Sequence, residues 1–393
     1  MTLDFDEGDE LRDLRAAVAD LAGRYGHRWF LEQARTGGTV QELWAEAGKA
    51  GFLGVNLPEE HGGGGGGMVE LAVVLEELGA AGCPLLMMVV SPAICGTVIA
   101  RYGTPEQRDR WIPGIADGTL TMAFAITEPD AGSNSHEITT TARRDGDEWV
   151  LSGQKIWISG VDVADAVLVV AKLADAGDST LPGSGRRTLR PALFVVPTGA
   201  PGLSRTQIPM ELVSPDNQFQ LFLDDVRLPA DALVGSPDAG IAQLFAGLNP
   251  ERVMGAAYSL GTARLALDRA AAYARDRRVW GTPIGAHQGV SHPLAAAQVE
   301  VELARLMMLK AAWLIDHGLD AGTAANSAKY AAAEAVVHAV DAAVQTHGGS
   351  GLSQENGIGA LVTASRFSRI APVSREMVLN FVAQHDLQLP RSY

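Results

Sequence analysis

Two short segments in the middle of the chain bring together groups that suit a planar, polar ligand. Residues 123–134 lead from an apolar run into a turn that contains proline, glycine and hydroxyl side chains. Such a turn can offer backbone N–H groups and hydroxyls to the polar edge of a ring. Residues 153–160 place Trp157 and Ser159 two positions apart, so both project from one face of a predicted strand. Taken singly, the tryptophan is more often a core residue and the serine a hydroxyl bonded to backbone.

A carboxylate suited to proton transfer follows a proline at residues 250–252. Pro250 is compatible with a helix start, so we expect Glu251 in a first helical turn, where the partial positive charge favours a carboxylate. A free glutamate titrates near ~4.3, and burial would raise its pKa and make it a better base. Taken alone, the commoner interpretation is an acid that pairs with a nearby lysine or arginine.

The cysteines and histidines indicate no metal site. Cys83 and Cys95 lie in apolar surroundings, with no Cys-x-x-Cys pair. The spacing of His287, His292 and His347 offers no metal geometry. We therefore expect buried thiols in a reducing compartment.

Composition narrows the class of protein further. The 393 residues include 46 acidic and 31 basic ones, for a net charge of -15, so nucleic acid is an unsuitable partner. No apolar run approaches the ~20 residues that span a bilayer. The acidic first ten residues lack the pattern of a signal peptide. These features predict a soluble, cytoplasmic protein with no membrane span.

Hydrophobic periodicity divides the chain into three regions. Residues 1–119 show helical spacing, with a helix start at Thr104. Residues 120–235 contain short β-rich runs, and Asp145-Gly146 predicts a hairpin between two of them. Residues 236–393 show long helical patterns with short connections, typical of a bundle. We therefore expect an α+β fold, mostly α: a helical domain, a central β domain and a C-terminal four-helix bundle.

The order of motifs resembles that of the acyl-CoA dehydrogenase family. Residues 123–134 and 153–160 are similar to the two segments that line and cover the flavin in that family. Residues 101–113 resemble the segment that precedes the β domain. Residues 273–288 resemble the tetramer-contact segment, and residues 345–351 resemble its Gln-x-x-Gly-Gly-x-Gly loop. The resemblance covers essentially the whole chain and implies FAD as cofactor and oxidation of an acyl thioester between its α and β carbons.

The resemblance also implies roles for individual residues. The residues expected to contact the flavin ring are Phe124, Ile126, Thr127, Trp157 and Ser159. The residues expected to hold the pyrophosphate and adenosine across a subunit interface are Arg277, Trp280, Gln288, Gln345 and Gly349. The residues expected to bind the substrate are Ser133 and Arg252.

The position of the catalytic base departs from the commonest family pattern. Most members carry the base in a C-terminal Tyr-Glu-Gly-Thr segment, which residues 369–377 lack. In the isovaleryl and long-chain subset the base lies in a Glu-Arg pair on the first bundle helix, which Glu251 and Arg252 resemble. Glu376 matches a later, non-catalytic acid. If Pro372, which has no N–H, occupies the position of the family's backbone donor to the thioester carbonyl, the donor comes from Ala371 or Val373 or is missing.

The resemblance implies an electron-transfer flavoprotein as redox partner and a homotetramer, or a heteromer with a sister subunit. Three alternatives remain open at this stage. One is a flavin oxidase or monooxygenase on the same fold. Another is a dehydrogenase whose acyl group is carried by a carrier protein instead of CoA. The third is a partner subunit that lacks catalysis.

Overall fold

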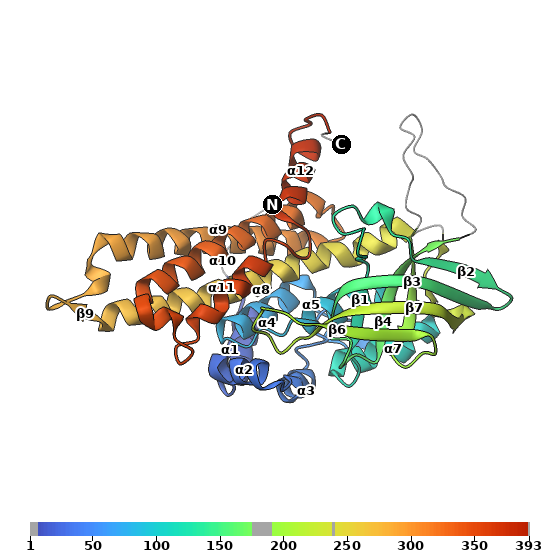
Figure 1. Cartoon of the computed structure of the whole chain (residues 1–393), viewed down its shortest axis with the longest axis horizontal. Coiled ribbons are helices and arrows are strands. Elements are labelled where there is room, and N and C mark those ends of the chain that lie inside the picture. Colours follow the sequence, from blue (N-terminus) through green and yellow to red (C-terminus); the bar gives the residue numbers. More distant parts are fainter. Residues whose placement is uncertain (1–6, 175–190, 238–239, 392–393) are drawn as a thin grey trace.

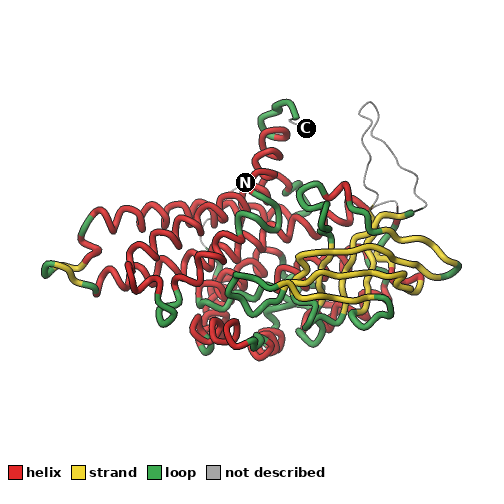
Figure 2. The backbone as a smooth tube through the Cα atoms, in the orientation of Figure 1, coloured by secondary structure: helices red, strands yellow, loops and turns green. Residues whose placement is uncertain are grey.

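The computed structural model describes residues 7–174, 191–237 and 240–391. The molecule is elongated, with the β domain at one end and the tip of the helical bundle at the other (Figure 1). Helices dominate the bundle and the N-terminal region, and strands are confined to the β domain apart from one small hairpin at the bundle tip (Figure 2). Within the described ranges, no helix combines the length and apolar character needed to cross a bilayer.

The N-terminal region is helical, as predicted. Its elements are α1 (Asp9–Gly23), α2 (Gly26–Thr36), α3 (Gln41–Lys49), η1 (Glu59–His61), α4 (Met68–Ala80), α5 (Met87–Val90), the π-helical turn η2 (Ser91–Gly96), α6 (Thr97–Tyr102) and α7 (Pro105–Asp117). Thr104 caps α7 by accepting a hydrogen bond from the Gln107 amide, which confirms the predicted helix start. The glycine run 62–67 forms a loop, but Gly64, Gly65 and Gly66 donate to backbone carbonyls of residues 54–57. This loop therefore packs back on the chain, contrary to the flexible tip that its composition suggests.

The β domain is built on one sheet in the order β6-β7-β3-β2-β4-β5-β8, with β1 parallel to β4. Its strands are β1 (Met122–Ala125), β2 (Thr141–Asp145), β3 (Glu148–Ser159), β4 (Ala166–Leu173), β5 (Pro191–Pro197), β6 (Leu203–Ile208), β7 (Gln218–Pro229) and β8 (Leu233–Val234). The turn after Asp145 joins β2 and β3 as an antiparallel hairpin, with Gly146 at φ 61°, as predicted. The strand that leads into the 126–134 turn is confirmed as β1, whereas the sequence did not reveal β6 or β8. The polar loop expected at 176–191 lies mostly outside the described residues.

The C-terminal region is a bundle of three long helices with shorter ones on its surface. These are α8 (Gly240–Asp276), α9 (Gln288–Asp316), α10 (Gly322–His347), α11 (Leu361–Phe367) and α12 (Arg375–His385), with the hairpin β9 (Arg278–Val279) and β10 (Thr282–Pro283) between α8 and α9. Helix α8 runs from the β domain to this hairpin, whereas α12 projects from the side of the bundle (Figure 1).

The start of α8 corrects one prediction. We expected a helix to begin near Pro250, but α8 is already helical at Gly240 and contains Pro250 in its interior. Glu251 is therefore not in a first helical turn. The helix tolerates the proline because its first half lies against the body of the protein, where tertiary packing offsets one missing N–H donor.

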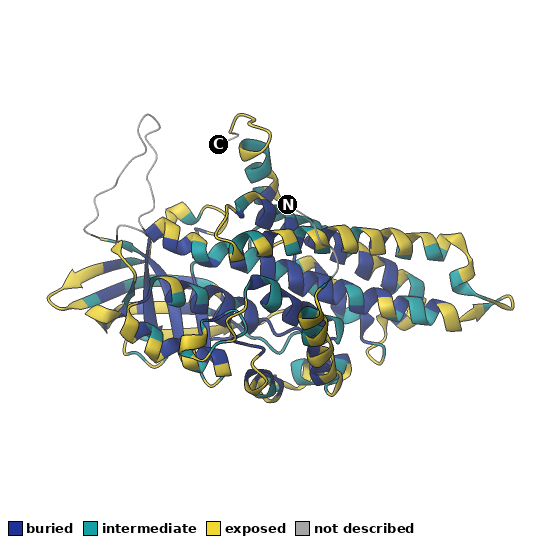
Figure 3. Ribbon diagram, turned by 180° about the vertical axis from the view of Figure 1, so that it is seen from behind, coloured by how far each residue is buried: buried dark blue, intermediate teal, exposed yellow. Residues whose placement is uncertain are grey.

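Buried side chains form a core that joins the regions (Figure 3). One apolar cluster unites α1, α3 and α4 with α8, α9 and α10. A second fills the space between η2, α6, α7 and one face of the sheet, and a third covers the sheet's other face. Because the first cluster is shared, the N-terminal helices and the bundle form one packed body, from which residues on α8 can face the β domain.

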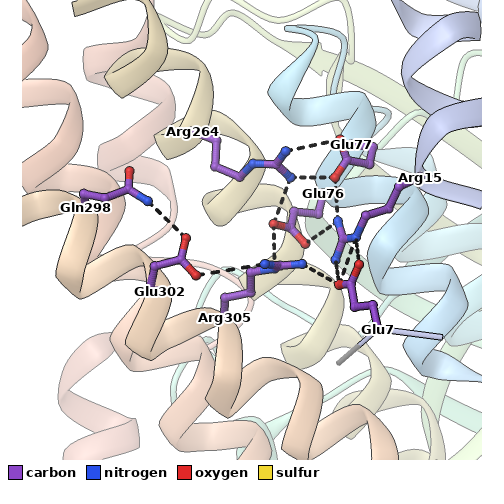
Figure 4. Close-up of polar contacts among 8 residues, drawn as sticks. All are labelled: Glu7, Arg15, Glu76, Glu77, Arg264, Gln298, Glu302 and Arg305. Carbon is purple, nitrogen blue, oxygen red and sulfur yellow. Dashed lines mark hydrogen bonds and ion pairs between the residues drawn. The ribbon is translucent and has the colours of Figure 1, made fainter. Parts of the chain in front are cut away.

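A charged cluster ties the N-terminal segment to the bundle (Figure 4). Glu76 and Glu77 on α4 form ion pairs with Arg15 from α1 and Arg264 from α8, and the Arg264 Nη1 atom lies 2.7 Å from Glu77 Oε1. Arg305 from α9 binds Glu76 at 3.3 Å. Glu76 is fully buried, and a buried charge is costly unless it is paired. Here three cations surround the two carboxylates. The cluster therefore sets the register of α4 against α8.

Candidate active site

The two segments predicted to face the flavin are joined beneath their surface by a buried ion pair. The Lys155 ammonium donates to the Ile126 carbonyl at 3.0 Å and to Glu128 at 2.9 Å. The same carboxylate accepts from the backbone amides of Thr139 and Thr140. Burial opposes the charge of Glu128, but Lys155 and these hydrogen bonds outweigh it and lower its pKa to about 2. Burial lowers the pKa of Lys155 to about 8, so at neutral pH both groups stay charged.

The predicted flavin-facing side chains lie around this pair. Phe124 is buried in β1, while Ile126 and Thr127 are half-buried at its end. The Thr127 carbonyl accepts from the Ile156 amide at 2.9 Å, which brings the turn alongside β3. Ser159 donates to Gln218 at 3.0 Å. The structure thus brings these residues together, and Ser133 lies exposed on the same turn.

Two exposed tryptophans have a backbone conformation that bulky residues rarely adopt. Trp157 is 52% exposed at φ 61°, next to an irregularity in the β3–β7 register. Trp280 is 92% exposed at φ 51°, in the turn between β9 and β10. Positive φ at an L-residue costs free energy, and such outliers concentrate where a ligand is bound. Both tryptophans belong to the segments that the sequence assigns to cofactor binding.

The residues predicted to hold the pyrophosphate and adenosine lie toward the bundle tip, away from the β domain. Arg277, Trp280 and Gln288 surround the β9–β10 hairpin, at the bundle tip (Figure 1). Gln345 and Gly349 lie at the end of α10, which the stacked rings of Tyr273 and His347, 4.6 Å apart, hold against the end of α8. All five are exposed or nearly so. One chain therefore brings the predicted cofactor residues together as two separate groups.

Glu251 lies on the part of α8 near the β domain, in a low-dielectric environment that retains some access to solvent. Burial raises the pKa of Glu251 to about 7, against the opposing effects of the Arg252 and Lys329 cations. The carboxylate also raises the pKa of the buried Cys95 thiol on η2. Arg252 donates from Nη1 to the Leu248 carbonyl at 2.9 Å, and its contact with substrate stays a prediction. A carboxyl group that is neutral and charged in similar amounts near pH 7 is suited to proton abstraction.

The C-terminal segment that lacks the Tyr-Glu-Gly-Thr motif passes close to Glu251. A Cβ atom on Gly255, one turn after Glu251, would lie 3.2 Å from Pro372 Cδ. The Ala371 amide donates to the Phe367 carbonyl at 3.0 Å. Among the described residues the Val373 amide has no protein acceptor. Of the two donors considered from the sequence, only Val373 is therefore available to a ligand. Glu376 is exposed in the first turn of α12.

A small cavity of about 20 Å³, which the sequence did not predict, lies at the junction of the N-terminal region and the β domain. Its lining includes Met87 and Asp216. Burial raises the pKa of Asp216 to about 6, although Ser214 donates a hydrogen bond to it. Asp216 in turn adds to the effect of burial in raising the pKa of Tyr258 on α8. Leu85 and Met87 also line this cavity.

These groups fit FAD. The flavin ring system needs an aromatic or apolar face together with hydrogen-bond donors at its edge, and the half-exposed Trp157 with the 126–133 turn offers both. The pyrophosphate needs a cation and close backbone approach; Arg277 is an exposed cation and Gly349 an exposed glycine, and their contact with this group stays a prediction. Together with the helix–sheet–bundle order, they define a flavin-dependent dehydrogenase.

Comparison with known proteins identifies the family. Sequence models of the acyl-CoA dehydrogenase N-terminal, middle and C-terminal domains match residues 8–119, 123–226 and 238–387. The chain is 65% identical over 391 residues to the acyl-CoA dehydrogenase FadE12 of Mycobacterium tuberculosis, with 99% of each chain covered. The protein belongs to the acyl-CoA dehydrogenase family, and it is an FAD-dependent enzyme that oxidises acyl-CoA thioesters.

Solved structures agree with this assignment. A glutaryl-CoA dehydrogenase in complex with glutaryl-CoA superposes with a TM-score of 0.92 at 29% identity, covering 99% of this chain and 98% of the other. PigA with FAD and proline superposes with a TM-score of 0.90 at 26% identity, covering 98% and 100%. The predicted fold class and cofactor are thus confirmed. Members of the family bind acyl-CoA and are oligomeric.

Proposed function

We propose that Glu251 is the base that removes the α proton of the acyl-CoA. The observation that carries this proposal is the burial of its carboxyl group on α8, which raises its pKa to about 7. Bound FAD supplies the two-electron acceptor for the hydride that leaves the β carbon. Glu251 takes the proton, and the Val373 amide donates to the thioester carbonyl oxygen, where negative charge develops. Ser133 contacts the thioester from the turn of the β domain.

Anaerobic flavin reduction tests this proposal. The protein loaded with FAD is mixed with a panel of straight, branched, aromatic and steroid acyl-CoAs, and the flavin absorbance is followed. With the best substrate, Glu251→Gln should keep FAD and thioester binding but reduce the flavin about a hundredfold more slowly, the usual worth of a positioned base. Glu376→Gln is the matched control, because its exposed carboxylate should leave the rate unchanged. Rapid bleaching by Glu251→Gln with a slow Glu376→Gln variant would transfer the role to Glu376.

We also propose that the cofactor is bound across two subunits. The residues around Trp157 would hold the flavin ring, and Arg277, Trp280, Gln288, Gln345 and Gly349 of a second copy would hold the pyrophosphate and adenosine. Burial of the tryptophan at the bundle tip by a ligand would account for its exposure in one chain. Trp280→Ala should weaken FAD binding without changing the fold, as measured by fluorescence titration of the apoprotein. Unaltered affinity would contradict the shared site.

A second copy of this chain is the partner that we propose for the exposed face of α9. Val299, Leu303 and Leu306 recur at helical spacing and are each more than half exposed. The spacing suits helix-to-helix packing in a homotetramer. Sedimentation of the wild-type protein and of Leu303→Glu should show a tetramer and a smaller species respectively. A wild-type monomer, or co-purification of a sister chain in fixed ratio, would contradict the homotetramer.

The physiological electron acceptor that we propose is an electron-transfer flavoprotein. A flavin oxidase on the same fold remains the second candidate, because PigA, whose structure contains FAD and proline, shares this architecture. Reoxidation of the product-bound, reduced enzyme separates the two. Fast reoxidation by electron-transfer flavoprotein and slow reoxidation by O₂ support a dehydrogenase, and the reverse would support an oxidase. Comparing the same acyl chain on CoA and on a carrier protein tests the substrate class.

We place the domain boundaries near residues 119 and 235.

A further inference from the structure

Lys329 on α10 is a buried lysine beside the proposed catalytic groups. Its side chain is 2% exposed, and within the described part of the chain no carboxylate oxygen lies within 4.0 Å of its ammonium. Its protein acceptor is the carbonyl oxygen of Val373, in the C-terminal segment. Burying an ammonium with a single neutral acceptor is costly, so a role other than packing requires consideration.

The segment that carries Val373 is fixed at both ends by ion pairs and a backbone hydrogen bond, whereas few contacts hold its centre. Glu334 on α10 binds Arg369 at 2.7 Å and Arg375 at 3.0 Å, and the Arg375 amide donates to the Arg369 carbonyl at 3.0 Å. These contacts fix the two ends of the loop. Between these ends, Pro372 lies close to Gly255 on α8, and the Val373 carbonyl accepts the hydrogen bond from Lys329 on α10. Lys329 therefore provides a polar contact to the centre of the segment, at the Val373 carbonyl.

The same ammonium is a source of positive charge for the proposed base. Burial raises the pKa of Glu251, and the cations that oppose this rise are Arg252 on its own helix and Lys329 on α10. The neighbour on η2 is Cys95, a thiol whose pKa is itself raised, so it carries no charge at neutral pH. Burial and Arg252 lower the pKa of Lys329 to about 8, while Glu376, Glu251 and Glu334 oppose the change, and the lysine is charged near pH 7.

We propose that Lys329 is a positioning residue that serves both proposed catalytic groups. Its hydrogen bond holds the Val373 segment so that the Val373 amide remains available to the thioester carbonyl. Its charge keeps Glu251 ionised to a larger extent than burial alone would allow. The inference rests on the proposed function, since it takes Glu251 as the base and Val373 as the donor. Removing the ammonium should therefore alter two independent properties of the enzyme.

The experiment compares Lys329→Met, Lys329→Gln and Lys329→Arg in the FAD-loaded protein. Removing a cation beside a carboxyl group raises the pKa of that group. In the pH profile of anaerobic flavin reduction, the acid limb should therefore move to higher pH, by about one pH unit, in the methionine and glutamine variants. Lys329→Arg keeps the charge and should restore the wild-type limb. If the methionine variant fails to fold, judged by circular dichroism, the glutamine variant carries the comparison. Lys49→Met, at an exposed lysine on α3, is the matched control and should change neither property.

A second measurement reports on the Val373 segment without turnover. Hydrogen exchange of a peptide covering residues 369–375 should be about tenfold faster in Lys329→Met, because a hydrogen bond to a charged group has been removed. Binding of a non-reducible acyl-CoA analogue should weaken by a similar factor. An unchanged acid limb together with unchanged exchange in both neutral variants would refute the role of Lys329. A change in one property alone would refute the claim that one ammonium serves both groups.

The Glu251→Gln variant separates failure of this inference from failure of the proposed function. If that variant reduces the flavin at the wild-type rate, Glu251 is not the base and the electrostatic half of the inference is wrong with it. Hydrogen exchange in Lys329→Met still tests the hold on Val373 in that case. If Glu251→Gln is inactive while the Lys329 variants behave like wild type, the base stands and Lys329 is a packing residue.

Discussion

Breaking the Glu128–Lys155 pair should destabilise the β domain and weaken FAD binding together. Glu128 accepts four hydrogen bonds, from Lys155, from the amides of Thr139 and Thr140 and from the Thr139 hydroxyl, all between 2.6 and 2.9 Å. Lys155→Met removes one of the four donors and, among the described residues, the only cation that forms an ion pair with Glu128. At 2.9 Å and an effective dielectric constant of about 20, the attraction is on the order of 6 kcal/mol before the cost of desolvation is subtracted.

The net effect expected for either single variant is a loss of about 3–5 kcal/mol, the cost of leaving one buried charge without its partner. Glu128→Gln should be about as harmful as Lys155→Met. An amide has one oxygen, whereas all four partners of Glu128 are donors, so its NH₂ group must face at least one of them. The double variant should lose less than the sum of the two, because no unpaired charge remains.

Urea denaturation followed by tryptophan fluorescence measures the loss of stability, and titration of the apoprotein with FAD measures the cofactor's dissociation constant. The constant should rise by at least tenfold in each single variant, since the pair holds both flavin-facing segments in place. Arg227→Gln is the matched control. It breaks the exposed Arg227–Glu148 pair at 2.8 Å in the same domain and should leave both measurements unchanged. Additive losses in the double variant, or single variants with normal FAD affinity, would refute this reasoning.

Three further predictions concern the helical part of the molecule. Burial raises the pKa of Glu251 to about 7, so between pH 4.5 and about 7 the folded state keeps a proton that the unfolded state has lost. The contribution of this group to stability therefore falls as the pH rises through that window. At pH 8, Glu251→Gln should be more stable than wild type by at most about 3 kcal/mol in chemical denaturation. Gly261→Ala should destabilise by about 1–3 kcal/mol in the same assay, because its Cβ would lie 2.4 Å from the Glu76 carbonyl oxygen where α8 crosses α4, whereas an unchanged midpoint would show that the helices can separate there at no cost. Burial raises the pKa of the Cys83 thiol to about 12 and that of Cys95 further, so mass spectrometry should find neither alkylated by iodoacetamide at pH 8 until the protein unfolds.

Local signals in the sequence were sufficient for the three-region order and for several element boundaries. The Thr104 cap and the turn after Asp145 depend on neighbouring residues alone, and both were confirmed. The family resemblance likewise depends on contiguous motifs, which is why the fold, the activity and the cofactor followed from it. The strands that the sequence did not reveal are β6 and β8. Strand β6 is exposed along most of its length and so shows no apolar pattern, and β8 has two residues that pair with β5, far away in the sequence.

Tertiary structure alone decided how the chemical groups are arranged. Pro250 suggested a helix start, yet packing of α8 against the N-terminal helices carries the helix through it. Trp157 lies near the inner end of β3, where the β domain meets the N-terminal region, whereas Trp280 lies in the hairpin at the bundle tip, a separation that no spacing along the chain indicates. Burial shifts the pKa values of Glu251 and Lys329, and the charge of each group opposes the shift of the other, across two helices. Residue types and their order are local properties, whereas desolvation and Coulomb attraction depend on which distant segments exclude water from a site, and this is determined only when the chain has folded.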